Sequence, residues 1–162
     1  MFKVLKLTAL IVVLLLVQVT LLPAYLRDPF KPNLLLALVV YLGLRVPSRL
    51  GWALAFFIGI LQDCFSGIYL GLHGFVYLTI HFLFQLTSDR LYTGSRYLMV
   101  LAVFLATLGG GLLELVLLVL FSVAQGVYAT LLPSLVPQAL VNAFFTSVVL
   151  GVFPSLLKGE QP

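Results

Sequence analysis

Long runs of apolar residues, separated by short charged breaks, constrain this chain more than any other feature. Leu7 to Leu26 contains no charged residue, and Tyr97 to Ala124 contains only Glu114. A helix needs about 20 predominantly apolar residues to cross about 30 Å of hydrocarbon. Charged residues make up 9% of the chain, against about 25% in soluble domains. We therefore predict an all-α, polytopic membrane helix bundle.

The charged and proline-containing breaks divide the chain into about six transmembrane helices within one integral membrane domain, residues 1–162. The second is short, because Asn33 to Leu44 covers only about 18 Å at 1.5 Å per residue. It crosses only if it starts near Pro29 with Lys31 reaching the headgroups, or if the bilayer thins locally. The predicted spans are 7–26, 30–44, 50–66, 71–88, 97–124 and 138–157.

Glycine and proline clusters shape the last two predicted spans. The fifth span is long and is expected to tilt or bend at Gly109–Gly111. The segment that follows, 126–137, contains Pro133 and Pro137. Because proline interrupts helical hydrogen bonding, this segment is expected to lie at the membrane interface rather than to span.

Basic residues set the expected orientation. With six spans and a cytoplasmic N-terminus, seven basic residues lie inside and two outside, in agreement with the positive-inside rule. A five-span alternative, in which 33–44 does not cross and the N-terminus is outside, gives the same count. We prefer six spans, with both termini cytoplasmic, because two lysines directly precede the first span. The inside set is Lys3, Lys6, Arg45, Arg49, Arg90, Arg96 and Lys158, and the outside set is Arg27 and Lys31.

Small residues recur every four positions in the third and fifth spans, and each series ends in an acid. Such stripes let a second helix approach closely, and intramembrane acids usually face protein. Both acids are expected to point into helix contacts. The candidate helix-packing or partner-binding residues are Gly51, Ala55, Gly59, Gln62, Asp63, Ala106, Gly110 and Glu114.

Each intramembrane acid has a structural alternative. For Asp63 it is a hydrated carboxyl near the interface or the cap of a helix end. For Glu114 it is an interhelical hydrogen bond, with the carboxyl paired or protonated. Cys64, beside the first acid, is expected to be a small buried residue.

A polar row follows the fourth span at intervals of four residues and suits a partner helix or a wet groove. Its members are His73, Tyr77, His81, Gln85 and Asp89, and Asn142 with Thr146 form a weaker pair in the sixth span. For both histidines the alternative is hydrogen bonding within the bundle. Two histidines eight residues apart are weak support for a metal site.

The sequence contains none of the motifs that would indicate chemistry. A Gly-rich phosphate loop and a His-Glu-x-x-His motif are both missing. Ser66 lacks the flanking glycines of a nucleophile elbow, and the single cysteine excludes an intrachain disulfide. We therefore expect no catalytic residue, metal or cofactor. With 13 Phe and no charge-rich tail, we also expect no nucleic-acid partner.

An ordered series of short motifs between residues 31 and 74 resembles the rod shape-determining protein MreD family. That family typically opens its second span with Pro-Asp/Asn-Leu-Leu, and its third span leads through an acid into Ser-Gly and Leu-Gly pairs. The chain carries these pieces in order: Lys31-Pro32-Asn33-Leu34-Leu35-Leu36, Val39-Val40-Tyr41-Leu42, Arg45, Gly51, Phe57, Gly59, Leu61-Gln62-Asp63, Ser66-Gly67, Leu70-Gly71-Leu72 and Gly74.

The resemblance implies a non-enzymatic scaffold in the bacterial inner membrane that takes part in cell shape and lateral peptidoglycan synthesis. Its implied partner is MreC, a single-span membrane protein, and through MreC the MreB filament and the elongation peptidoglycan synthases. Self-association is a further option. Members of the family also resemble the substrate-binding subunits of energy-coupling-factor transporters in fold. A small-ligand-binding subunit of such a transporter is therefore the alternative function.

Overall fold

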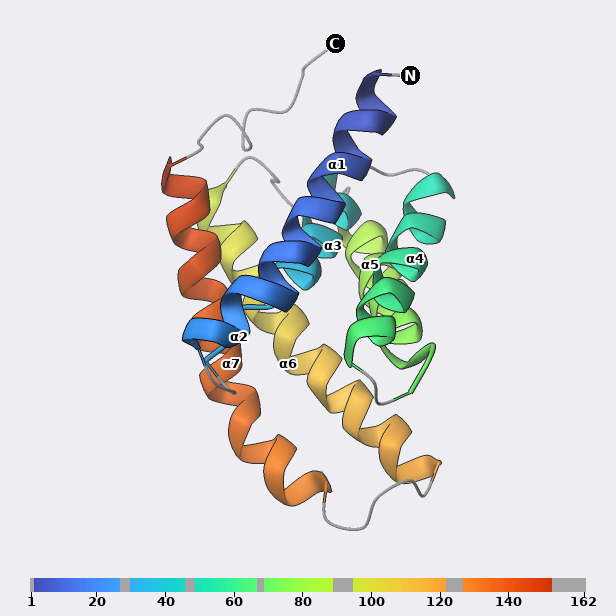
Figure 1. Cartoon of the computed structure of the whole chain (residues 1–162), viewed down its shortest axis with the longest axis vertical. Helices are drawn as coiled ribbons and strands as arrows, with labels where there is room; N and C mark the ends of the chain where they lie inside the picture. The colour runs from blue at the N-terminus through green and yellow to red at the C-terminus, as the bar shows by residue number, and fades with distance from the viewer. Residues whose placement is uncertain are drawn as a thin grey trace.

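The chain is an all-α helix bundle. A computed structural model describes residues 2–26, 30–45, 49–66, 69–88, 95–121 and 127–152. Within these ranges every regular element is a helix (Figure 1). Asp89 of the predicted polar row lies outside them. The helices are α1 (Phe2–Leu16), η1 (Val17–Leu21), α2 (Leu22–Tyr25), α3 (Leu34–Arg45), α4 (Arg49–Ser66), α5 (Leu72–Ser88), α6 (Arg96–Leu120) and α7 (Val127–Val152).

The first helical segment contains a widened turn. In η1 the helix is of the π type, and the N–H of Leu22 donates to the Val17 carbonyl five residues earlier. Pro23 follows at the start of α2. A proline lacks an N–H and clashes with the carbonyl four residues before it. The π turn accommodates this proline and lets helical structure continue to Tyr25.

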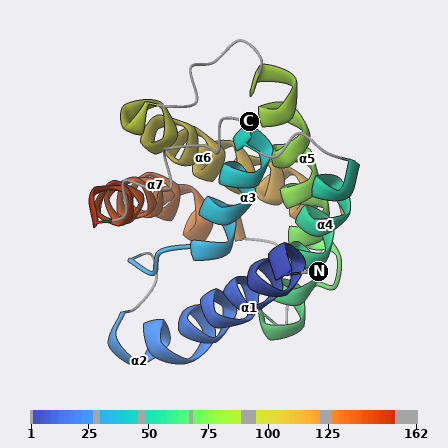
Figure 2. The ribbon, with the colours of Figure 1, turned by 90° about the horizontal axis from the view of Figure 1, so that it is seen from above.

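The short helix α3 forms the centre of the bundle. It packs against α1, α4, α5, α6 and α7, and Figure 2 shows these helices arranged around it. The two most extensive contacts are α4 with α5 and α6 with α7. Leu35, Val39 and Val40 of α3 are at most 1% exposed and lie at the core.

Two helical stretches, Arg96–Leu120 and Leu131–Val152, are long and apolar enough to cross a membrane. Shorter apolar stretches occupy Ala9–Tyr25, Leu34–Leu44 and Leu50–Phe65. The outward-facing side chains suit contact with lipid: Phe57, Leu83 and Phe144 are 60%, 57% and 71% exposed.

The last two helices differ in extent from those predicted. The segment 126–137 was predicted to be too broken for a span, but α7 starts at Val127 and continues through Pro133 and Pro137 to Val152. Prolines four apart place their ring clashes on one side of a helix, and membrane helices tolerate such positions when neighbouring groups satisfy the freed carbonyls. In addition, α6 continues as one helix through Gly109–Gly111 and ends at Leu120.

Candidate functional site

Asp63 joins α4 to the beginning of α5. Its carboxylate is buried and accepts hydrogen bonds from the backbone N–H groups of Gly71 (2.8 Å), His73 (3.1 Å) and Gly74 (3.3 Å). The His73 Nδ1 atom also lies 2.7 Å from Asp63 Oδ1. The first N–H groups of a helix have no partner within it, and the carboxylate supplies that partner. Asp63 therefore caps α5 from a neighbouring helix.

Two glycines make this cap possible. Gly71 has a φ of 96°, a conformation that glycine adopts without the steric cost of a Cβ, and it turns the chain into α5. At Gly59, an added Cβ would lie 2.5 Å from the Gly74 Cα. Because that neighbour is backbone, the two helices approach too closely for a larger residue. The stripe residues Gly51 and Ala55 are also buried, and α4 packs most extensively against α5.

A second polar cluster surrounds the N-terminus of α3, with Asn33 at its centre. The Asn33 Oδ1 atom accepts hydrogen bonds from the Leu36 N–H (3.0 Å) and Gln18 Nε2 (3.3 Å). Gln18 Oε1 accepts from the Leu35 N–H (3.1 Å), and Asn142 Oδ1 accepts from the Asn33 N–H (2.7 Å). Side chains from η1 and α7 thus satisfy the free N–H groups of a helix that begins inside the bundle.

The amide cluster extends to three more helices. The Tyr77 hydroxyl of α5 lies 3.0 Å from Asn33 Oδ1 and also hydrogen-bonds Gln62 of α4. Asn142 Nδ2 donates to Thr107 Oγ1 of α6 at 2.9 Å. We refer to Gln18, Asn33, Gln62, Tyr77, Thr107 and Asn142 as the amide cluster. Residues of η1, α4, α5, α6 and α7 therefore contribute to it, and it caps the start of α3.

The small-residue stripe of α6 also faces other helices. Ala106 is 3% exposed, and a Cβ on Gly110 would lie 2.9 Å from the Ile80 Cδ1 of α5. A Cβ on Gly111 would overlap the Leu135 side chain of α7, whereas Gly109 has open space around it. The glycine triplet thus allows close approach on two sides of α6.

Glu114 lies one turn beyond this contact and is half-buried. It is within electrostatic range of His73 and Asp63 but forms no hydrogen bond with the described part of the chain. The interhelical hydrogen bond expected for it is not found there. The Asp63 oxygens accept from α5, and His73 Nδ1 contacts Asp63 rather than Glu114.

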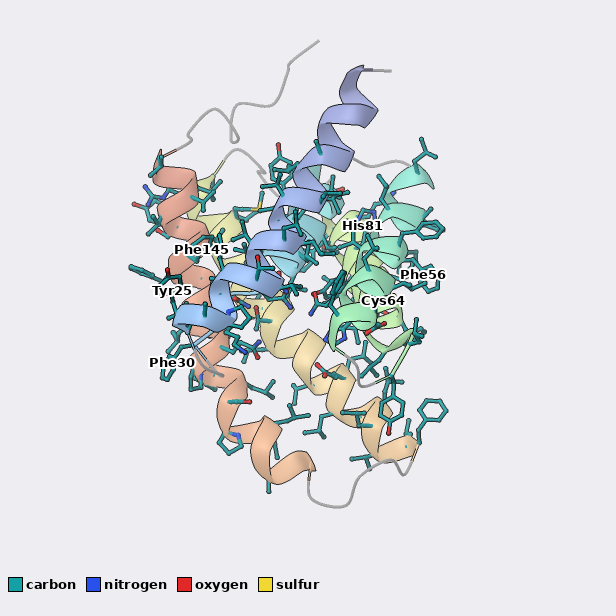
Figure 3. All side chains as sticks on the ribbon, viewed as in Figure 1. Tyr25, Phe30, Phe56, Cys64, His81 and Phe145 are labelled. Atoms are coloured by element: carbon teal, nitrogen blue, oxygen red, sulfur yellow. The ribbon has the colours of Figure 1, made fainter. Side chains whose placement is uncertain are left out.

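The polar row of α5 divides among different environments. His73 and Tyr77 join the two clusters, and Gln85 Oε1 accepts a hydrogen bond from the Trp52 indole of α4. His81, labelled in Figure 3, is fully buried. Its ring nitrogens form no hydrogen bond of normal geometry with the described residues, and the Val39 backbone of α3 is their polar neighbour. The bundle hydrogen bond expected for both histidines is present only at His73. The ring of His81 lies against α3 near Gly43.

Cys64 was wrongly expected to be buried. It is exposed although Asp63, the preceding residue, is buried. Successive residues of an α-helix lie about 100° apart around its axis, so the packing side of α4 at Asp63 does not include Cys64.

Sequence reasoning missed Gln18 and Thr107, and it used Asn33 only as part of a motif. Gln18 carries the only amide side chain of the apolar run 7–26, and Thr107 is the only hydroxyl residue of the run 98–113. That rarity was the available signal. No periodicity connects them, because their hydrogen bonds join positions 15 to 109 residues apart.

Comparison with protein-family models matches residues 1–158 to the family described as rod shape-determining protein MreD. Comparisons with curated proteins and with solved structures found no match.

Proposed function

Because the chain belongs to the rod shape-determining protein MreD family, we propose that it is a non-catalytic, multi-pass scaffold that binds MreC. The family assignment makes it a rod-shape-determining membrane protein. Through MreC it would connect to MreB and the elongation peptidoglycan synthases in the bacterial inner membrane. Both termini would be cytoplasmic.

One observation carries the scaffold proposal: the polar groups of Asp63 and of the amide cluster hold helices together. Asp63 is committed to the start of α5 and Asn33 to the start of α3. Hydrogen bonds between membrane helices stabilise their association by about 0.6–2 kcal/mol each. Such an interior supports a rigid body that offers its outer surface to partners. The stripe ending in Asp63 contacts α5, so the MreC surface is sought on the lipid-facing sides instead.

Co-purification tests the proposal directly. The full chain is co-expressed with affinity-tagged MreC, extracted in mild detergent and recovered on the tag. We expect recovery of both proteins, and little recovery with an equally tagged, unrelated single-span protein. Equal recovery with both baits, or none with MreC, would contradict MreC binding.

The ligand-binding alternative has a cavity of suitable size but not of suitable chemistry. About 680 Å³ opens between the start of α5 and the end of α6, among apolar residues such as Leu72, Phe75 and Leu118. Small-molecule sites combine apolar walls with a few convergent polar groups. The convergent groups of this chain hydrogen-bond one another in the amide cluster. Saturable thermal stabilisation by a vitamin or metal ion would revive this alternative.

A further inference from the structure

The two most closely packed helix pairs differ in length. The short pair consists of α4, with 18 residues, and α5, with 17. The long pair consists of α6, with 25 residues, and α7, with 26. At 1.5 Å per residue the short pair covers about 26–27 Å and the long pair about 37–39 Å. At one end of the molecule α6 and α7 extend beyond the connection between α4 and α5 (Figure 1).

Both pairs present apolar side chains outward, so both lengths act on the surrounding bilayer. Phe65 of α4 and Leu83 of α5 are exposed, as are Leu112 of α6 and Val136 of α7. The shorter helix α3 lies at the centre of the bundle, so its length concerns the protein interior. The hydrocarbon core of a bilayer is about 30 Å thick. The short pair therefore falls below this thickness, and the long pair exceeds it.

The connection between α4 and α5 limits how deep the short pair can lie. Tyr69 and Leu70 are not helical, and Leu70 is 78% exposed. Irregular backbone that faces lipid does not occur within the hydrocarbon region. Since the apolar stretch of α4, Leu50–Phe65, covers only about 24 Å, the hydrocarbon on this side must end near the connection.

Aromatic residues mark the same two boundaries. Trp52, about one turn into α4, is exposed and donates a hydrogen bond to Gln85 near the end of α5. Tyr69 follows the other end of α4 and is also exposed. Tryptophan and tyrosine favour the interface between membrane and water. From Trp52 to Ser66, α4 covers about 21 Å, which agrees with a thin bilayer on this side.

The long pair has no polar boundary at that level. After Glu114 the next charged residue is Lys158, and Leu120 and Phe121 at the end of α6 are strongly exposed. Burial of such apolar surface in hydrocarbon is favourable. Tilts of up to about 40° let a helix of about 37 Å span about 28 Å. Tilting therefore fits α6 and α7 to a bilayer of normal thickness, whereas no tilt lengthens α4 or α5.

We propose that the bilayer is thinner beside α4 and α5 than beside α6 and α7, so that the chain imposes a step on the lipid around it. A bilayer accommodates a short apolar stretch by thinning, at modest cost. A cavity of about 680 Å³ lies at the step, between Tyr69 and Leu70 of the connection and Leu117 and Phe121 of α6. Its apolar walls suit acyl chains that bend around the step. In the proposed orientation the step lies in the outer leaflet; that assignment rests on the proposed function, whereas the difference in thickness does not.

The depths of two labels in the membrane test the step. Cys64, labelled in Figure 3, is exposed and is the single cysteine of the chain. Leu112 of α6 is also exposed. The two residues lie about 22 Å and about 24 Å along their helices from Arg49 and Arg96. A bilayer of uniform thickness would therefore place them at similar depths.

The full chain is labelled with a fluorophore at Cys64, or at position 112 of a Leu112→Cys, Cys64→Ser variant. It is reconstituted alone into dioleoylphosphatidylcholine vesicles that contain lipids with a nitroxide either at the headgroup or deep in the acyl chain. We expect the headgroup nitroxide to quench the Cys64 label about two-fold more strongly than the deep nitroxide, and the reverse at position 112. Because no MreC is present, the result does not depend on the proposed function.

Equal quenching profiles at the two positions would mean a single bilayer thickness and would overturn the proposal. A Cys64 label that aqueous iodide quenches, and neither lipid quencher does, would also overturn it, because that label lies in a water-filled recess. A series from dimyristoleoyl to dierucoyl phosphatidylcholine needs only the native cysteine. We expect the Cys64 label to stay near the headgroups throughout. A label that sinks as the bilayer thickens refutes the step, even if the Leu112→Cys variant does not fold.

Discussion

At the scale of single residues, the two acids within the bundle are expected to contribute differently to the stability of the fold. Asp63 accepts three backbone hydrogen bonds, whereas Glu114 forms none with the described residues. Each buried donor left without a partner costs about 1–3 kcal/mol. Asp63→Ala should therefore lower the free energy of unfolding by about 3 kcal/mol, and Asp63→Asn, which keeps one acceptor oxygen, by less.

Glu114→Gln is the control for that pair of variants and should change stability by no more than about 0.5 kcal/mol. Thermal or denaturant unfolding in detergent measures all three. If Asp63→Ala were as stable as Glu114→Gln, the carboxylate could not be the cap of α5.

His81 is a single residue whose replacement is expected to raise the free energy of unfolding, in contrast to Asp63. Both of its ring nitrogens are buried without a hydrogen bond of normal geometry to the described residues, and a buried, unsatisfied polar group is destabilising. His81→Leu replaces the ring with an apolar side chain and is expected to raise the free energy of unfolding by about 1 kcal/mol. Tyr77→Phe, one turn earlier, removes a hydroxyl that is hydrogen-bonded and should lower it by about 1 kcal/mol. A loss of stability in His81→Leu would mean that the imidazole has a polar partner.

At the scale of helices, glycine position distinguishes close packing from flexibility. Gly59→Ala places a Cβ against the backbone of α5, whereas a Cβ on Gly109 meets nothing within 4 Å. We expect Gly59→Ala to destabilise the bundle by more than about 2 kcal/mol, and Gly109→Ala to stabilise it slightly, because alanine favours helix by about 1 kcal/mol over glycine. Melting temperatures of the two variants provide the measurement, and equal values would contradict the α4–α5 contact.

Among the helices, features that repeat locally could be predicted from the sequence, and features that depend on tertiary packing could not. Period-four stripes identified Gly59, Asp63 and Gly110 as packing positions, because helix geometry repeats locally. The start of α7 was missed, because Pro133 acts as a helix breaker in water but not beside neighbouring membrane helices. The amide cluster was missed as a unit, because Gln18 and Asn142 each reach Asn33 only through tertiary packing.

At the scale of the whole molecule, parity constrains the topology. The start of α1 and the end of α7 lie at the same end of the bundle (Figure 1), which requires an even number of crossings. Reporters fused to either terminus should therefore give the same cytoplasmic signal, and a reporter inserted at 122–126 should give the external one. Signals on opposite sides for the two termini would restore the five-span alternative.

The even count depends on α3, which at 12 residues covers only about 18 Å. A helix this short begins within the membrane, so its first N–H groups lie where water is scarce and an unpaired polar group is costly. Gln18, Asn33 and Asn142 take the place of that water. Replacing Asn33 with leucine should therefore disturb the crossing itself: we expect mixed reporter signals at 46–48, with the termini unchanged. Leu34→Ala is the control, because it changes the neighbouring residue and keeps the Asn33 amide, and it should keep a single signal at 46–48.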